Sequence, residues 1–363
     1  MKKQNMVIIA IGIVLIAAAG FFTINPLGTF SGNVIVEDMV GRNVTIPSNP
    51  DKIVSTSSPL TSLIYMIAPD RLVALSSSFD NSTKYVTDTY RRLPAIGAWH
   101  GKKGTGNDEE LLALHPSFII DSPRVRDGKV VDDDLDLIIN KFSTIPVVAV
   151  PETANLTNIN KTYEFLGKIL HAESTANKLK DTLNKYLSLG EKTKNQMKDN
   201  PKKVYYAQDE NGLSTSPPGS EHAQVLDIIG AKNVADTNLS AETTTVSIEQ
   251  VIQWNPDTII TTNKNFFENV YNNSQWSNIN AVKNKQVYLA PNDPFNWFDM
   301  PPGSNMIVGI PWALKVVYGD QVKDLDLKKE VKEFYTNFFH YDLTDDDLSN
   351  ILKSSAPDGV NLT

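Results

Sequence analysis

The sequence predicts an α/β protein with two Rossmann-like, three-layer lobes that are joined by a single long helix. Short apolar runs alternate with helical segments up to Val150, and the same alternation restarts after Pro201. This alternation is typical of parallel sheets that helices cover on both faces. The intervening stretch 157–198 contains no proline and has helical spacing of its apolar residues. We expect the ligand cleft to lie between the two lobes.

The first half begins with two β-prone runs, Val34–Val36 and Val44–Ile46, around a turn at Gly41, and these predict a hairpin. The next strand, at 52–55, is followed by serines and Pro59, which favour a helix start because serine caps the helix and proline fits its first turn. Apolar residues then recur at helical spacing up to Ile67. Further strands are predicted at 72–75, 118–120 and 147–150, with a helix at 109–114.

The stretch 157–198 predicts two helices, and the second begins near Ser174. At 1.5 Å per residue the second helix is roughly 35 Å long, enough to bridge two lobes. The second half predicts strands at 204–206, 258–260 and 286–289, and helices at 223–229, 247–253, 309–318 and 327–339. The predicted organisation is an N-terminal segment (1–32), an N-terminal lobe (33–172), a linking helix (173–199) and a C-terminal lobe (200–363).

The N-terminal segment has the pattern of an export signal. Lys2 and Lys3 precede an uncharged apolar run from Met6 to Phe22. The run fits either a membrane anchor or a cleaved signal peptide, and an uncleaved anchor is the interpretation we favour. Both put the chain after about Ser31 outside the cytoplasm, at the cell surface or in the periplasm, since positive charge stays inside. A buried core helix is a third interpretation, but the run shows no polar face.

Composition excludes several classes of function. The 34 Lys and Arg residues are outnumbered by 42 Asp and Glu residues, so a nucleic-acid partner is not expected. The absence of cysteine excludes disulfides, iron–sulfur clusters, thiolate zinc sites and a lipoprotein anchor. No Gly-x-Ser-x-Gly or His-Glu-x-x-His motif occurs, so neither an enzyme nor a resident cofactor is expected.

Six segments in order carry a resemblance to a known family, and they are 37–47, 52–57, 107–114, 247–250, 255–257 and 281–288. In these segments the chain resembles the cobalamin, siderophore and iron-complex binding proteins of ABC importers. The resemblance implies that the chain captures a metal chelate outside the cell, for example an iron–siderophore or a corrinoid. It also implies delivery to a permease dimer in the membrane, which is driven by a cytoplasmic ATPase.

The resemblance further implies a docking role for two glutamates. Glu109 and Glu249 occupy the positions at which members of this family place one acidic residue per lobe, to pair with arginines of the permease. Two carboxylates on separate lobes would set the spacing and register on a dimeric partner. The alternative is that each is a solvated first-turn glutamate favoured by the helix dipole.

Ligand-binding residues are expected in loops at the carboxyl ends of strands. The resemblance implies aromatic cleft walls, which suit a large, flat chelate, although core packing is the alternative for Trp297 and Phe298. The candidate ligand-binding residues are Ser57, Ser58, Ser78, Phe79, Trp99, His100, Thr215, Glu221, His222, Trp297, Phe298 and Asp299.

Of the five histidines, only His100 and His222 fall in predicted cleft loops, one in each lobe. Neutral imidazole is a good ligand for iron, nickel and cobalt. Two histidines would complete the coordination of a metal whose chelator leaves positions open, whereas a bare ion normally needs three or four protein ligands. The alternative is that each histidine only hydrogen-bonds within its loop. The sequence does not identify the chelate. Two other functions also stay open: a chelatase-like enzyme, or a surface sensory or structural protein with this fold.

Overall fold

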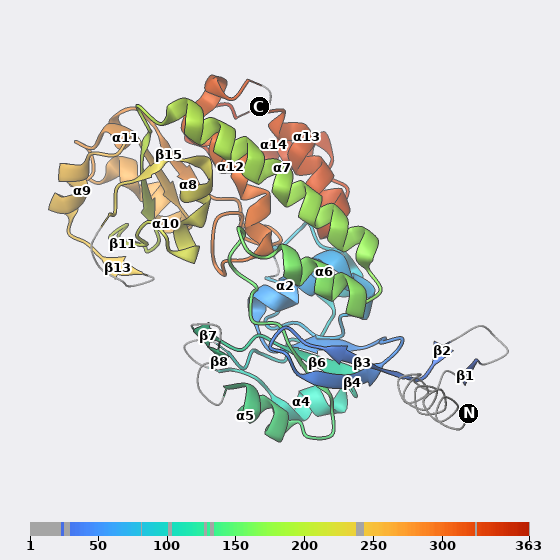
Figure 1. The fold of residues 1–363 in the computed structure, drawn as a ribbon. Coiled ribbons are helices and arrows are strands. Elements are labelled where there is room, and N and C mark those ends of the chain that lie inside the picture. The colour runs from blue at the N-terminus through green and yellow to red at the C-terminus, as the bar shows by residue number, and fades with distance from the viewer. Residues whose placement is uncertain are drawn as a thin grey trace, which may run out of the picture.

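The computed structural model describes residues 23–24, 30–80, 82–100, 104–126, 129–130, 134–236, 243–323 and 325–362. Two α/β lobes are joined by one long helix, which confirms the predicted fold class (Figure 1). The apolar N-terminal run predicted as an anchor or signal lies outside the described residues. Within the described residues, no helix has the length and apolar character needed to cross a membrane.

The first lobe contains a three-stranded parallel sheet in the order β5-β6-β9. Its strands are β5 (Ile53–Ser55), β6 (Phe118–Asp121) and β9 (Val147–Ala149), and every residue in them is buried. The strand predicted at 72–75 is wrong: Leu72 and Leu75 form only single bridges, to Ile53 and Ala95 respectively. The chain therefore leaves the sheet edge after one pairing with β5 and cannot form a ladder.

An antiparallel hairpin of β3 (Asn33–Glu37) and β4 (Asn43–Pro47) docks on this sheet, with the pairing that the sequence predicts. Asp38, which is buried, closes the turn by accepting bonds from the backbone and guanidinium of Arg42. The second carboxylate oxygen of Asp38 also accepts from the backbone N–H of Ala149. One buried carboxylate thus fixes the hairpin to β9. The helices of this lobe are α2 (Ser58–Ile67), α3 (Asp88–Arg91), α4 (Asp108–Ala113), α5 (Asp134–Lys141) and α6 (Asn160–Ile169).

The linking helix α7 (Glu173–Met197) is 25 residues long and runs unbroken alongside both lobes (Figure 1). Its buried positions, which include Leu179, Leu183 and Tyr186, form one seam facing α6, α8 and α12. Gly190 belongs to this seam because a Cβ there would lie 2.5 Å from the carbonyl oxygen of Ile228. The close approach of α7 to the second lobe therefore requires glycine at this position.

The second lobe is built around a parallel sheet in the order β12-β10-β14-β15. A separate two-stranded antiparallel ladder of β11 (Ser214–Thr215) and β13 (Thr244–Thr245) lies beside it. The sheet strands are β12 (Lys232–Asn233), β10 (Lys203–Ala207), β14 (Thr258–Thr261) and β15 (Val287–Leu289), and the helices are α8 (Gln224–Ile229), α9 (Ile248–Trp254), α10 (Lys264–Asn269) and α11 (Asn280–Lys283).

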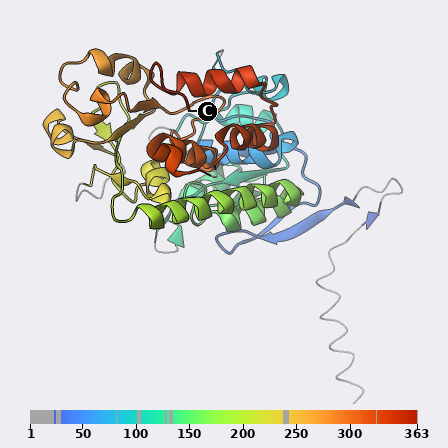
Figure 2. The ribbon, with the colours of Figure 1, turned by 90° about the horizontal axis from the view of Figure 1, so that it is seen from above.

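The C-terminal helices tie the two lobes together and lie beside α7 when the molecule is seen from above (Figure 2). The Tyr65 hydroxyl of α2 donates to the carbonyl oxygen of Phe339 at 2.8 Å, and Nε2 of His340 lies 2.8 Å from the carbonyl oxygen of Tyr65. The helix predicted at 327–339 is α-helical only in its first part and ends in one π turn. These elements are α12 (Gly309–Tyr318), α13 (Leu327–Phe334), the π turn η6 (Tyr335–Phe339) and α14 (Asp345–Ser354).

Candidate functional site

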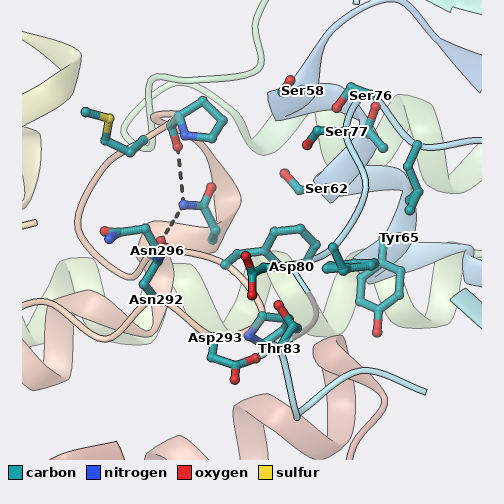
Figure 3. A pocket seen from close by; sticks show the side chains of 18 of the residues that line it. Ser58, Ser62, Tyr65, Ser76, Ser77, Asp80, Thr83, Asn292, Asp293 and Asn296 are labelled. Carbon is teal, nitrogen blue, oxygen red and sulfur yellow. Dashed lines mark hydrogen bonds between the residues drawn. The ribbon is translucent and has the colours of Figure 1, made fainter. Parts of the chain in front are cut away.

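A cavity of about 460 Å³ lies where loops of the two lobes meet (Figure 3). The first lobe contributes one side of α2 and residues 75–80, 82 and 83, and the second contributes residues of the loop 292–301 and Asn305. The lining is mostly neutral and polar. Its hydroxyl groups come from Ser58, Thr61, Ser62, Ser76, Ser77, Ser78, Ser82 and Thr83, its carboxamides from Asn292, Asn296 and Asn305, and its carboxylates from Asp80 and Asp293.

Three predicted residues, Ser58, Ser78 and Phe79, line this cavity. Ser58 is there because the chain leaves β5 and begins α2 at once, with Pro59 in the first turn, as the sequence predicts. Ser57 is the N-cap residue, but its hydroxyl makes no capping bond and is buried without a hydrogen-bond partner among the described residues. The hydroxyl oxygen of Ser57 is therefore a buried polar atom without a hydrogen bond within the described part of the chain, next to the cavity where the loops of the two lobes meet (hereafter the lobe junction).

The cavity has two chemically different ends. Ser58, Ser62, Ser76 and Ser77 gather on one side, whereas Asp80, Asp293 and Thr83 lie on the other (Figure 3). Hydrogen bonds from the side chain and backbone of Ser82 hold the pKa of Asp80 below its ordinary value. Burial raises the pKa of Asp293, and the backbone N–H groups of Lys84 and Tyr85 only partly oppose it.

Aromatic side chains form one wall of the cavity. The rings of Phe79 and Phe295 lie 5.8 Å apart, and Tyr65 packs 5.6 Å from Phe295. Of the four aromatic residues that the sequence predicts for the wall, Phe79 lines the cavity, whereas the second lobe contributes Phe295 in place of Trp297 and Phe298. A loop sequence rich in aromatic residues indicates such a wall, but it does not show which ring faces the cavity.

The cleft role expected for Trp297 and Phe298 is therefore wrong, because both side chains are fully buried in the core. The indole N–H of Trp297 donates to the hydroxyl of Tyr335, and the Phe298 ring packs 4.8 Å from that of Tyr206. Trp99 also points away from the cavity. Its N–H donates to Asp108 at 2.7 Å, and its ring packs on Phe142 inside the first lobe.

His100 forms a tight pair with a buried carboxylate at the end of β6. Its Nε2 lies 2.7 Å from Oδ1 of Asp121, and the Thr56 hydroxyl donates to the same oxygen at 2.5 Å. Burial disfavours the imidazolium, but the hydrogen bond and negative charge of Asp121, with the charge of Asp134, outweigh it and raise the pKa of His100 above 6.5. Asp121 was missed by sequence reasoning, although a carboxylate directly after the apolar run 118–120 is a usable signal.

His222 makes the corresponding pair in the second lobe. Its Nδ1 lies 2.7 Å from Oδ1 of Asp299, which is fully buried. The other oxygen of Asp299 accepts bonds from the Tyr206 hydroxyl at 2.7 Å and from Nε2 of Gln208 at 3.3 Å. Burial and the charge of Asp299 raise the pKa of Tyr206 well above its ordinary value. Asp299, predicted as a ligand-binding residue, therefore orients His222.

Both histidine–aspartate pairs adjoin the cavity-lining segments. Thr56 precedes Ser58 by two residues, and Asp299 is followed at once by Met300, which lines the cavity. The loop after Asp299 also reaches the first lobe, since a Cβ on Gly303 would lie 3.5 Å from the carbonyl oxygen of Thr153. One pair from each lobe is thus placed at the junction.

Two other predicted ligand-binding residues, Thr215 and Glu221, do not line the cavity. Thr215 is fully buried in β11. Glu221 is exposed and lines a separate surface depression with Gln224 and Asp227. Among the side chains that the structure describes, no group of three or more His, Asp or Glu residues is arranged to hold a metal ion.

Glu109 and Glu249 are both exposed in the first turns of short helices, α4 and α9. Each helix starts at a polar N-cap, Asn107 or Ser247, whose side chain accepts a backbone hydrogen bond. Three residues after each glutamate stands an exposed apolar side chain, with Leu112 at 42% exposure and Ile252 at 43%. The two lobes therefore present similar pairs of an acidic and an apolar group.

The chain is similar to proteins of known class over most of its length. The family described as "Periplasmic binding protein" matches residues 53–294. The molybdate-binding protein MolA of Haemophilus influenzae is 25% identical over 84% of this chain and 90% of its own length. The uncharacterized ABC transporter substrate-binding lipoprotein YvrC of Bacillus subtilis is 25% identical over 80% of this chain and 87% of its own length.

Solved structures of binding proteins have a fold similar to that of this chain. An ABC transporter solute binding protein from Sulfurospirillum deleyianum has a TM-score of 0.78 and 28% identity, and the match covers 88% of this chain and 99% of that one. The structure of MolA bound to molybdate has a TM-score of 0.68 and 21% identity, covering 86% of this chain and 99% of that chain, and supports the fold alone. The chain belongs to the periplasmic binding protein family and is the extracytoplasmic substrate-binding component of an ABC transporter.

Proposed function

We propose that this protein captures a metal chelate between its two lobes and delivers it to a permease dimer with a cytoplasmic ATPase. The observation that carries the proposal is the pair of histidines at the junction, one per lobe, each bonded to a buried carboxylate. Metal-binding histidines almost always bond a carboxylate, carbonyl or water through their other ring nitrogen, which fixes the ring and raises its basicity. His100 and His222 have this arrangement.

The number of histidines favours a complexed metal over a bare ion. A site for a bare ion would normally need three or four protein ligands, and no such group occurs in the described part of the chain. Two imidazoles suit iron, nickel or cobalt in a complex that leaves two positions open. The cavity beside them, with the aromatic rings of Phe79 and Phe295, would hold the organic part of the chelate.

Delivery would use Glu109 and Glu249, which pair with arginines of the permease in this proposal. Their exposure on separate lobes supports it, because two such charges fix both position and register on a dimeric partner. The apolar N-terminal run would tether the protein to the membrane.

The proposal is tested by a thermal-shift panel on the purified protein. The panel contains ferric siderophores, ferric citrate, cobinamide, cobalamin, haemin, nickel–histidine, molybdate and tungstate. A ligand at about 100 times its Kd stabilises by roughly 2.7 kcal/mol, which is a readily measured shift. Molybdate is included because it is the ligand that MolA is named for.

We expect one chelate to raise Tm, and His100→Ala and His222→Ala each to remove most of that shift. His171→Asn is the matched control, because His171 is exposed and bonds Ser48 far from the junction. A shift with oxyanions alone, or a chelate shift that both alanine variants retain, would contradict the proposal. Turnover of a metal with a metal-free tetrapyrrole would favour a chelatase instead.

A further inference from the structure

Buried polar side-chain atoms that lack a hydrogen-bond partner occur beside the cavity and the two histidine–aspartate pairs. Of the eight such atoms among the described residues, one is Oδ1 of the cavity-lining Asn305 and another is Oγ of Ser57, next to Ser58. Two more belong to side chains bonded into the pairs, Oδ2 of Asp121 and Oε1 of Gln208. One of these four atoms is a hydroxyl oxygen and three are carbonyl or carboxylate oxygens.

The unpaired side-chain amide oxygens of Asn305 and Gln208 can only accept hydrogen bonds. The side-chain nitrogen of Asn305 donates to the carbonyl oxygens of Asn296, at 2.5 Å, and Pro301, at 3.2 Å. A carbonyl oxygen only accepts, so the amide cannot be flipped, and Oδ1 is the atom left unpaired. Gln208 is fixed in the same way, because its nitrogen donates to a carboxylate oxygen of Asp299.

Asp121 adds a third acceptor from the first lobe. Its Oδ1 takes the bonds of both His100 and Thr56, which leaves Oδ2 buried and unpaired. Asp80 and Asp293 add negative charge along the cavity, and the described residues that line it include no lysine or arginine. The serine hydroxyls do not decide the ligand's character, because a hydroxyl can donate or accept.

We infer that the ligand presents hydrogen-bond donors and neutral or positive charge to the junction. This inference rests on the proposed function, whose ligand class it narrows. The ligand is then a metal complex with coordinated amine or water, or with outward N–H and O–H groups, that donates to Asn305, Gln208 and Asp121. A tetrahedral oxyanion carries only acceptors and negative charge, so it leaves the three acceptors unpaired, which is unfavourable in a buried site.

Hexaamminecobalt(III) is a suitable probe. It carries a charge of +3 and outward N–H donors, and its ligands exchange too slowly for a histidine to coordinate the metal. Isothermal titration of the purified protein at physiological salt would compare it with molybdate and tungstate. The variants are Asn305→Leu and Gln208→Leu, and Asn195→Leu on the exposed face of α7 is the control.

We expect the ammine complex to bind at one site and the two oxyanions not to compete with it. Each junction variant should weaken binding about ten-fold, the effect of one lost hydrogen bond to a charged donor, while Asn195→Leu leaves it unchanged. Circular dichroism checks that the variants fold. If either fails to fold, the comparison of the three ligands on the unaltered protein still decides the question.

Oxyanion binding without ammine binding would overturn the inference, and so would ammine binding that both junction variants retain. The chelate panel on the unaltered protein separates the inference from the proposed function, because the ammine complex is inert and cannot test coordination by a histidine. Ammine binding with no chelate binding anywhere in the panel would leave the inference standing and remove the proposed function.

Discussion

The buried carboxylate of Asp299 lies 2.7 Å from Nδ1 of His222, although the two residues are 77 positions apart in the chain. Tyr206 and Gln208, both from the end of β10 or the loop after it, hold the other carboxylate oxygen. The orientation of the imidazole is therefore set by three segments of the second lobe that meet at the ends of its strands. This makes Asp299 a positioning residue for His222, which contacts the ligand in the proposed function.

Asp299→Asn should weaken chelate binding by about 10- to 100-fold, the range typical of lost partners of metal-bound histidines. The substitution keeps the size of the side chain but removes the charge that raises the basicity of His222. Titration calorimetry with the chelate from the panel measures the effect. Asp345→Asn, on the exposed start of α14, is the control. Unchanged affinity in Asp299→Asn would show that His222 does not coordinate the metal.

Chelate binding should weaken in acid because a metal needs the neutral imidazole. The pKa of His100 in the folded protein is raised above 6.5, mainly by Asp121 acting against burial. Affinity should therefore start to fall at a pH above 6.5 and continue to fall below it. Calorimetry between about pH 5 and pH 8 tests this, with His100→Gln expected to lose much of the pH dependence.

The same pKa shift predicts the opposite trend for stability without ligand. Because the folded-state pKa of His100 is raised, the pair with Asp121 stabilises the fold fully below the unfolded pKa. That contribution is lost as the pH rises through the folded-state pKa. The difference in Tm between the wild type and His100→Gln should therefore be larger in mild acid than in mild alkali. An equal difference at both pH values would contradict the shift.

Much of the fold could be predicted from local patterns. The hairpin β3–β4, strands β5, β6 and β14, and helix α12 follow from apolar periodicity and from turn or cap residues. The segment 72–75 has the composition of a strand but forms only single bridges, because its pairing depends on where the chain turns next. No local pattern distinguishes the α-helical part of 327–339 from its final π turn.

The site was harder to predict because its contacts are non-local. His100 and His222 could be selected from their places in loops after strands. Their carboxylate partners lie 21 and 77 residues away, so only the fold shows the pairing. Trp297 was assigned to the cleft and lies in the core, since a loop's sequence does not show which of its side chains turns inward.

Gly190→Ala should destabilise the protein by about 1–3 kcal/mol, the usual cost of overpacking. Alanine favours a helix over glycine by up to about 1 kcal/mol, but its Cβ would lie 2.5 Å from the backbone oxygen of Ile228. Urea denaturation measures the change. Ser188→Ala, two residues earlier on the exposed side of α7, is the control and should be neutral or slightly stabilising. A stabilised Gly190→Ala would mean that α7 can move away from α8.

Charge reversal at the proposed docking sites should separate transport from ligand capture. Glu109→Arg with Glu249→Arg should abolish uptake in cells, because each arginine would meet the arginines of the permease. Chelate affinity of the purified protein should stay within about two-fold, since both glutamates are exposed on α4 and α9. Glu210→Arg, also exposed, is the control for added charge. Normal uptake in the double variant would exclude this docking mode.

Ligand binding should close the lobes by only a few degrees. Helix α7 is unbroken over 25 residues and contains no proline, so it resists bending. The bonds from Tyr65 to Phe339 and His340 also hold α2 of the first lobe on the C-terminal helices. Small-angle scattering with and without chelate should give nearly identical profiles. A marked compaction would contradict this prediction, and Tyr65→Phe would then test whether loss of one tie enlarges the motion.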